Sequence, residues 1–257
     1  PLVHLRVCRP RAMTPMRRRH IQREVRIHSN FKHENAVGFR GAWEDGGSVC
    51  IVQEFAGGGD LFNLLEKCGG RLSEHTVITK ILRPLLLSLG SLHARGVVHR
   101  DIKPENIFFS TEGVLKLGDF GLSVNMREEP AVERLGTLDY MAPEVIAIPR
   151  KSEQAAGGQA AGPPAAASAY GAGVDVWAVG VLGFELIDGF PPFEVESEEL
   201  TCAMILWSEV QAWPEGISPA CRDFLSACLR KDPRKRPTVH DLLSHPWVVA
   251  HCPPEQA

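Results

Sequence analysis

Four polar residues in the middle of the chain have types and spacing suited to phosphoryl transfer. Asp101, Lys103 and Asn106 lie in the string His-Arg-Asp-Ile-Lys-Pro-Glu-Asn at 99–106, and Asp119 begins Asp-Phe-Gly 18 residues after Asp101. That reaction needs a group to orient the attacking hydroxyl, oxygen ligands for a metal ion, and positive charge over the transferred phosphate. Asp101 suits the first task, Asn106 and Asp119 the second, and Lys103 the third. Asp-Phe-Gly alone is a weak signal, but its combination with the longer string is specific.

Further motifs extend this pattern along the chain. Ala-Pro-Glu ends at Glu144, Asp-Val-Trp-Ala-Val-Gly begins at Asp175, and Asp-Pro-Arg-Lys-Arg-Pro contains Arg236. Together with the 99–106 string they resemble the eukaryotic protein kinase family over about residues 1–249. Lys103, two places after the aspartate, resembles the serine/threonine members. The stretches from Arg23 and up to Glu144 look most like Aurora-type kinases.

The resemblance implies a function and a set of roles. A serine/threonine protein kinase transfers the γ-phosphoryl group of ATP to Ser or Thr hydroxyls on proteins, with Mg²⁺. Asp101 and Lys103 would be catalytic, and Asn106 and Asp119 would hold the metal. Scaffold roles are implied for three further residues: Asp175 bonding the catalytic-loop backbone, and Glu144 paired with Arg236.

Residues before the catalytic string match the nucleotide side of the family. Backbone groups of Glu54 and Ala56 would bond adenine in the hinge, with Gln53 as gatekeeper. Asp60 falls at the ribose-binding carboxylate, although a helix N-cap explains it equally well. Glu24 would pair with the ATP-anchoring residue, a position held here by Arg6.

The start of the chain departs from the family in three ways that bear on activity. The glycine-rich loop is absent, and Gly57-Gly58-Gly59, a flexible bend after the hinge, is no substitute. Arg6 stands where the family has lysine, and its guanidinium could prefer a bidentate pair with Glu24 over the phosphates. His4 replaces a small alanine and should crowd adenine. A pseudokinase that acts as a binding scaffold is therefore the alternative function, and a different register at the chain end is the alternative explanation.

The segment between Ser123 and Thr137 contains no Ser, Thr or Tyr. In activated relatives, a phosphothreonine in this segment pairs with the arginine of His-Arg-Asp. Glu133 lies at the matching place, and we hypothesise that it pairs with Arg100 as a weaker phosphate mimic. The alternative is that Glu133 is simply an exposed acid.

Periodicity predicts the elements that position these residues. Residues 3–7 alternate like a strand, and Thr14-Pro15 starts a helix with Ile21, Glu24, Val25 and His28 on one stripe. Strand-like segments follow at 36–42 and 48–55, and helical periodicity dominates from Asp60. We expect an α+β, bilobal, protein-kinase-like fold: residues 1–55 a truncated β-rich small lobe with an exposed sheet edge, and 56–250 a mainly helical large lobe. An Ala/Gly/Pro-rich insertion at 150–172 should be a mobile loop.

Composition limits the partners. The net charge of −3 gives no reason to expect nucleic acid or a membrane, and no apolar run reads as long enough to span a bilayer. Expected partners are therefore ATP and proteins that carry Ser or Thr. Seven scattered cysteines fit a reducing, intracellular compartment, cytoplasmic or nuclear. The chain begins with Pro1, which we interpret as the start of a fragment.

Overall fold

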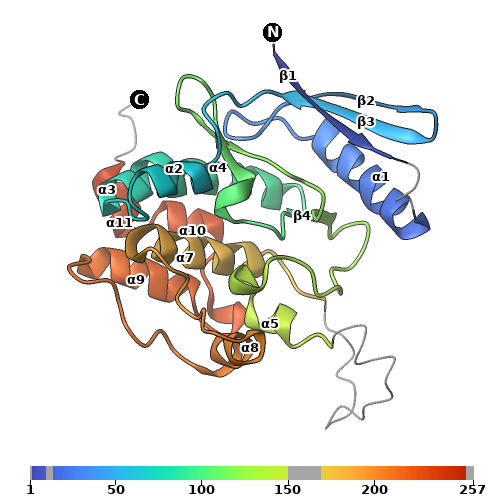
Figure 1. Cartoon of the computed structure of the whole chain (residues 1–257). Helices are drawn as coiled ribbons and strands as arrows, with labels where there is room; N and C mark the ends of the chain where they lie inside the picture. The colour runs from blue at the N-terminus through green and yellow to red at the C-terminus, as the bar shows by residue number, and fades with distance from the viewer. Residues whose placement is uncertain (1, 10–13, 150–168, 253–257) are drawn as a thin grey trace.

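The small lobe is a three-stranded antiparallel sheet with one helix beside it. The structure is a computed structural model and describes residues 2–9, 14–149 and 169–252. Strands β1 (Val3–Cys8), β3 (Ser48–Glu54) and β2 (Phe39–Asp45) lie in the order β1-β3-β2, so β1 forms an edge of the sheet. Helix α1 (Pro15–Ser29) runs along this sheet (Figure 1). The expected strands and helix are confirmed, and their register places His4 opposite Gln53 and Arg6 opposite Ile51.

Helix α1 presents an unusual stripe to the interior. Thr14 caps it, because the Thr14 side chain accepts a hydrogen bond from the Arg17 backbone nitrogen at 3.2 Å. Ile21 packs with Cys8, Val49 and Ile51 to form the small-lobe core. The same face carries Glu24 and His28, both buried. The buried face of α1 therefore carries two polar side chains, Glu24 and His28.

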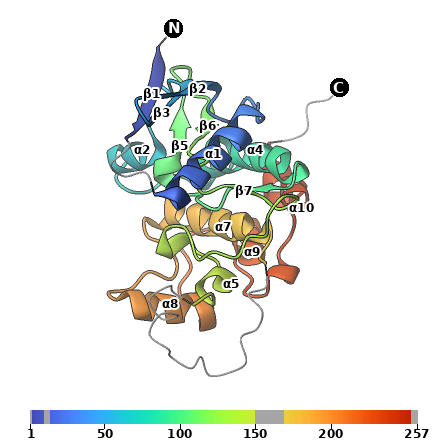
Figure 2. The ribbon, with the colours of Figure 1, turned by 90° about the vertical axis from the view of Figure 1, so that its right-hand side faces the viewer.

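The large lobe is mainly helical, and α7 (Gly173–Asp188) crosses its middle (Figures 1 and 2). Twelve of the 16 residues of α7 are buried, as expected for a mainly apolar helix in a protein core. Within the described residues, the large lobe also contains these helical elements: α2 (Leu61–Lys67), α3 (Glu74–Thr76), π-helix η2 (Val77–Leu82), α4 (Arg83–Ala94), η3 (Pro104–Asn106), η4 (Leu138–Tyr140), α5 (Pro143–Ile146), α8 (Glu198–Trp207), α9 (Pro219–Cys228), η5 (Pro233–Lys235), α10 (Val239–Leu243) and α11 (Pro246–His251).

One continuous helical run corrects a sequence expectation. Residues Glu74–Ala94 are long and apolar enough to cross a membrane by length and composition alone. Half of the run is buried in the large lobe, where Leu82, Leu85, Leu86 and Leu89 are fully enclosed. Its hydrophobicity is therefore explained by packing in the protein core.

Two short antiparallel strand pairs hold the loops between the lobes. β4 (Val97–Val98) pairs with β7 (Val124–Asn125), and β5 (Ile107–Phe109) pairs with β6 (Leu115–Leu117). The 99–106 string therefore connects β4 to β5, and Asp-Phe-Gly lies between β6 and β7. The α+β class with a β-rich and a helical part is confirmed. Most of the 150–172 insertion lies outside the described residues.

Candidate active site

Asp175 of α7 holds the backbone of the catalytic loop, residues 99–106, by hydrogen bonds. Its carboxylate accepts hydrogen bonds from the backbone nitrogens of His99 at 2.9 Å and Arg100 at 2.8 Å. Arg100 has a φ of 70°, a left-handed conformation that costs energy for a non-glycine residue and needs such support. Burial opposes ionisation of Asp175, but its bonds with His93 and the loop keep its pKa below the usual value. The scaffold role expected for Asp175 matches this geometry.

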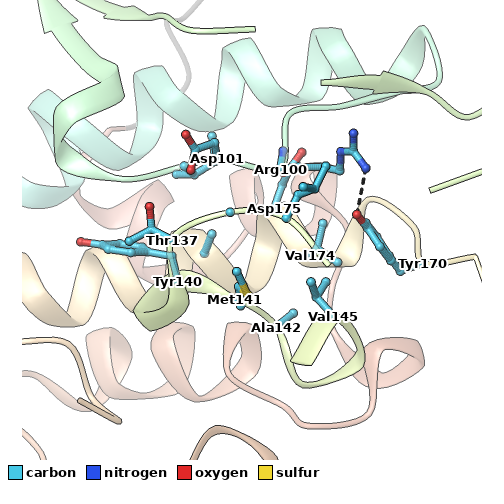
Figure 3. A pocket seen from close by; sticks show the side chains of 14 residues that line it. Arg100, Asp101, Thr137, Tyr140, Met141, Ala142, Val145, Tyr170, Val174 and Asp175 are labelled. Carbon is cyan, nitrogen blue, oxygen red and sulfur yellow. Dashed lines mark hydrogen bonds between the residues drawn. The ribbon is translucent and has the colours of Figure 1, made fainter. Parts of the chain in front are cut away.

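The side chains of Asp101, Lys103 and Asn106, all in this loop, lie close together. Asn106 Nδ2 donates to Asp101 Oδ2 at 2.7 Å and to the Asp101 carbonyl at 2.8 Å. Lys103 Nζ lies 3.5 Å from Asp101 Oδ2 and donates to Thr137 Oγ1 at 2.8 Å. Figure 3 shows Asp101 above Thr137, so the catalytic loop faces the segment before Ala-Pro-Glu. A cation and an amide therefore fix the orientation of one carboxylate oxygen.

Asp119 comes from the loop between β6 and β7. Its φ of 51° is also left-handed, and its Oδ1 accepts from the Gly121 backbone nitrogen at 3.0 Å. Asp119 and Asn106 both line a cavity of about 390 Å³ between the lobes. Since Asn106 uses its nitrogen for Asp101, its oxygen is left for another partner. An amide oxygen and a carboxylate are ligands suited to a hard cation such as Mg²⁺, which in nucleotide sites takes few protein ligands.

The same cavity contains the residues expected on the nucleotide side. Glu54, Ala56 and Asp60 line it, together with His4 and Arg6. Asp60 also caps α2, accepting from the Asn63 backbone nitrogen at 2.8 Å, so its N-cap role is confirmed; its ribose-binding role stays a prediction.

Gly58, in the glycine run after the hinge, is closely packed, which corrects the expected flexible bend at this position. A Cβ atom at Gly58 would lie 2.5 Å from the Ser110 carbonyl oxygen. The Gly58 backbone nitrogen donates to the Phe109 carbonyl at 2.9 Å. This contact holds the hinge end against β5, beside the cavity.

Arg6 is committed to two carboxylates. Its Nη2 contacts Glu24 Oε2, and its Nη1 lies 3.7 Å from Asp119 Oδ1. The pairing with Glu24 is confirmed, but the bidentate form is wrong, because Glu24 Oε1 has no partner. Burial lowers the pKa of Arg6, but attraction to Glu24 and Asp119 outweighs it and raises that pKa. Arg6 therefore holds the charge of a lysine at this position but directs part of it to the carboxylate of Asp119.

Replacing Arg6 with lysine should improve nucleotide use. A compact ammonium can keep the contact with Glu24 and release Asp119. We expect kcat/KM for ATP to rise about tenfold in Arg6→Lys, equivalent to about 1.4 kcal/mol. The assay is steady-state transfer at varied ATP, with Arg18→Lys as the matched control, since Arg18 pairs with the exposed Glu44. An unchanged or lower kcat/KM would show that Arg6 is not the limiting departure.

His28 connects α1 to the Asp-Phe-Gly segment. Its ring stacks on Phe120 with centroids 4.4 Å apart, and its Nε2 lies 2.7 Å from the Val37 carbonyl oxygen. Nε2 must therefore carry the proton, which leaves Nδ1 to accept from Gln53 Nε2 at 3.3 Å. Burial lowers the pKa of His28. A neutral His28 thus joins α1, the gatekeeper position and Phe120.

The hypothesis that Glu133 pairs with Arg100 is wrong. Arg100 donates from Nε to the Leu122 carbonyl at 2.6 Å and from Nη1 to the Tyr170 hydroxyl at 2.9 Å (Figure 3). The Glu133 carboxylate lies 3.8 Å from His20 Nε2 instead. Sequence reasoning missed Tyr170, which also donates to the Glu133 carbonyl at 2.8 Å. The sequence offered little to indicate a role for Tyr170: it is one of two tyrosines and lies at the end of the Ala/Gly/Pro-rich stretch.

Tyr140, in the segment that precedes Ala-Pro-Glu, and Glu185 of α7 form a half-buried polar pair. The Tyr140 hydroxyl donates to the Glu185 carboxylate. Burial, with repulsion from Glu105 and Glu194, raises the pKa of Glu185 to about 7 despite that bond. Glu185 therefore changes charge near neutral pH.

This titration should be visible in folding stability. The raised pKa means that the folded chain holds a proton on Glu185 that the unfolded chain releases. The contribution of Glu185 to the free energy of unfolding is fully present below its ordinary pKa of 4.5. This contribution is lost as the pH rises through about 7. Urea unfolding from about pH 5 to 8 should therefore show wild type losing stability relative to Glu185→Gln. Glu66→Gln, at an exposed position of α2, is the control; parallel pH profiles for wild type and Glu185→Gln would contradict the assignment.

Comparison with known proteins agrees with this geometry. The model of the protein kinase domain matches residues 3–248. The chain therefore belongs to the protein kinase family. It is 33% identical to an Aurora kinase of Schizosaccharomyces pombe over 90% of this chain and 59% of the relative. It is 33% identical to serine/threonine-protein kinase Aurora-2 of Arabidopsis thaliana over 91% and 76%, and 36% identical to calcium-dependent protein kinase 19 of rice over 89% and 40%.

The relatives place the chain among serine/threonine kinases of Aurora type, as the motifs indicated. The chain spans 51% to 59% of the length of several Aurora kinases that it matches. Its similarity therefore concerns the kinase domain.

Proposed function

We propose that this domain transfers the γ-phosphoryl group of ATP to serine or threonine hydroxyls of proteins. The observation that carries the proposal is the convergence of Asp101, Lys103 and Asn106 at one edge of a cleft that Asp119 also lines. The bond from the γ-phosphorus to the ADP oxygen breaks, a bond to the hydroxyl oxygen forms, and the hydroxyl proton passes to Asp101. Lys103, bonded to Thr137, keeps positive charge beside that carboxylate.

The nucleotide would lie in the 390 Å³ cavity. Backbone groups of Glu54 and Ala56 would bond adenine, and Asp60 the ribose. Asn106 and Asp119 would hold Mg²⁺, which supplies charge neutralisation on the phosphates when bound. Arg6, supported by Glu24, would contact the phosphates. All seven cysteines are unpaired, which supports a reducing, intracellular location, cytoplasmic or nuclear.

A binding role without turnover is the second candidate, and one observation favours it. Arg6 Nη1 lies 3.7 Å from Asp119 Oδ1, so a fixed cation competes for the carboxylate that would face the metal. His4 lines the same cavity, where its ring would leave less space for adenine than alanine would.

Transfer of label from γ-labelled ATP to a generic protein substrate, with and without magnesium, distinguishes the two candidates. We expect label on Ser and Thr in the presence of Mg²⁺ and loss of transfer when a chelator removes it, because the phosphate charge is then unneutralised. Phosphoamino-acid analysis identifies the acceptor. A sample that melts cooperatively but transfers no label with Mg²⁺ would support the binding role.

A further inference from the structure

A fixed cation lines the 390 Å³ cavity beside the two residues proposed to hold the metal. Arg6, Asn106 and Asp119 are all part of the cavity wall. Arg6 Nη2 contacts the buried carboxylate of Glu24, and Arg6 Nη1 lies 3.7 Å from Asp119 Oδ1. One guanidinium is therefore shared between two carboxylates on the side of the cavity where the phosphates of a nucleotide would lie.

The Arg6 guanidinium keeps donors that no protein acceptor uses. Among the described residues, its one side-chain hydrogen bond is to Glu24. The 3.7 Å between Nη1 and Asp119 Oδ1 is too long for a hydrogen bond, and Nε has no partner. The Arg6 side chain is 34% exposed and that of Glu24 only 4%, so Glu24 anchors Arg6 from the interior. Because a guanidinium presents its donors in a planar fork, Nη1 can donate to a phosphate oxygen while Nη2 keeps Glu24.

The same cation weakens the site proposed for the metal. Asp119 is the one carboxylate proposed as a metal ligand, and Arg6 already balances part of its negative charge. The other proposed ligand, Asn106, is neutral, and its Nδ2 donates to Asp101. A dication is attracted less by a partly neutralised carboxylate and an amide than by free carboxylates, and a nearby guanidinium repels it. Arg6 therefore lowers the affinity for a metal ion while it offers positive charge to the phosphates.

We propose that the cavity binds a nucleoside triphosphate without a divalent cation, with the Arg6 guanidinium donating to a phosphate oxygen. A lysine at this position would offer a point charge without the fork, so this binding mode depends on Arg6. It rests on the proposed function, since the nucleotide must lie in the 390 Å³ cavity. It concerns binding alone: transfer keeps its expected need for Mg²⁺, whereas binding does not.

The test is calorimetric titration of the full 257-residue chain with the β,γ-imido analogue of ATP, from which no phosphoryl group is transferred. Titrations with EDTA and with Mg²⁺ give two dissociation constants for each variant, and their ratio measures the metal dependence. We expect the two constants of the wild-type chain to agree within about threefold. In Arg6→Lys the ratio of the constant with EDTA to that with Mg²⁺ should rise at least about tenfold. Arg18→Lys, which changes an arginine paired with the exposed Glu44, should keep the wild-type ratio.

Adenosine, titrated with EDTA, separates contacts with the phosphates from contacts with the base. We expect the imido analogue to bind at least about tenfold more tightly than adenosine without metal. Equal or weaker binding of the analogue would overturn the proposal, and so would an Arg6→Lys ratio equal to that of wild type. Binding of the analogue only with Mg²⁺ would overturn it and leave the proposed function intact. A chain that melts cooperatively but binds no nucleotide in either buffer would overturn both.

Asp119→Asn is a second variant should Arg6→Lys not fold. Losing this carboxylate removes a negative charge near the phosphates and leaves Arg6 with Glu24 alone among the protein carboxylates. Metal-free binding of the imido analogue should therefore tighten at least about threefold. Unchanged or weaker binding would contradict the role given to Arg6.

Discussion

Asp101→Asn is expected to lower kcat for phosphoryl transfer by about 10²–10⁴-fold. Asparagine preserves the size of the side chain and can still contact Asn106, but it cannot accept the hydroxyl proton. It also removes the negative charge that lies 3.5 Å from Lys103 Nζ. We expect KM for ATP to change little, because Asp101 does not line the nucleotide cavity.

Steady-state transfer from γ-labelled ATP gives both constants. Asp223→Asn is the matched control, since Asp223 is exposed and pairs with His245 on the far helices. Retention of wild-type kcat in Asp101→Asn would mean that another group handles the proton, and the role given to Asp101 would be withdrawn. A large rise in KM with unchanged kcat would place Asp101 in nucleotide binding instead.

The sequence predicted the part of the fold that rests on short-range patterns. Thr14 before Pro15 located the start of α1, and the stripe Ile21, Glu24 and His28 identified its inner face. Long-range pairs such as Arg236 with Glu144 were predicted only because their motifs resemble a known family. Neither periodicity nor spacing could have joined residues so far apart in the chain.

Predictions from the sequence failed for two arginines that have several possible hydrogen-bond partners. Arg100 was expected to meet Glu133, but it bonds Leu122 and Tyr170, because the backbone path of residues 122–133 decides which acceptors lie within reach. Arg6 was expected to choose between a bidentate pair with Glu24 and the phosphates, yet it also lies 3.7 Å from Asp119 Oδ1. Both cases involve a long guanidinium with several donors, and its choice depends on three-dimensional distances that the residue order does not fix.

Removing one partner of the pair Arg236–Glu144 should cost more stability than breaking an exposed ion pair, because a charged group would be left without its partner. Arg236 donates to both carboxylate oxygens of Glu144, at 2.7 and 2.8 Å, and its side chain is fully buried. It also donates to the carbonyls of Arg230, Gly173 and Lys231, and its guanidinium lies 5.1 Å from the centre of the Trp177 ring. Losing it leaves a partly buried carboxylate and three carbonyls without their donor.

Arg236→Gln is therefore expected to lower the free energy of unfolding by about 3–5 kcal/mol. The control is Arg234→Gln, two residues away, whose side chain is 88% exposed and pairs with Asp232; it should change the stability very little, because water screens an exposed ion pair. Urea denaturation measures both variants. The double variant Arg236→Met with Glu144→Met should recover part of the loss, because replacing both charges removes the uncompensated one. Equal destabilisation by Arg236→Gln and Arg234→Gln would show that the buried pair contributes no more than a surface pair, and that the loop closing on Glu144 is held by packing alone.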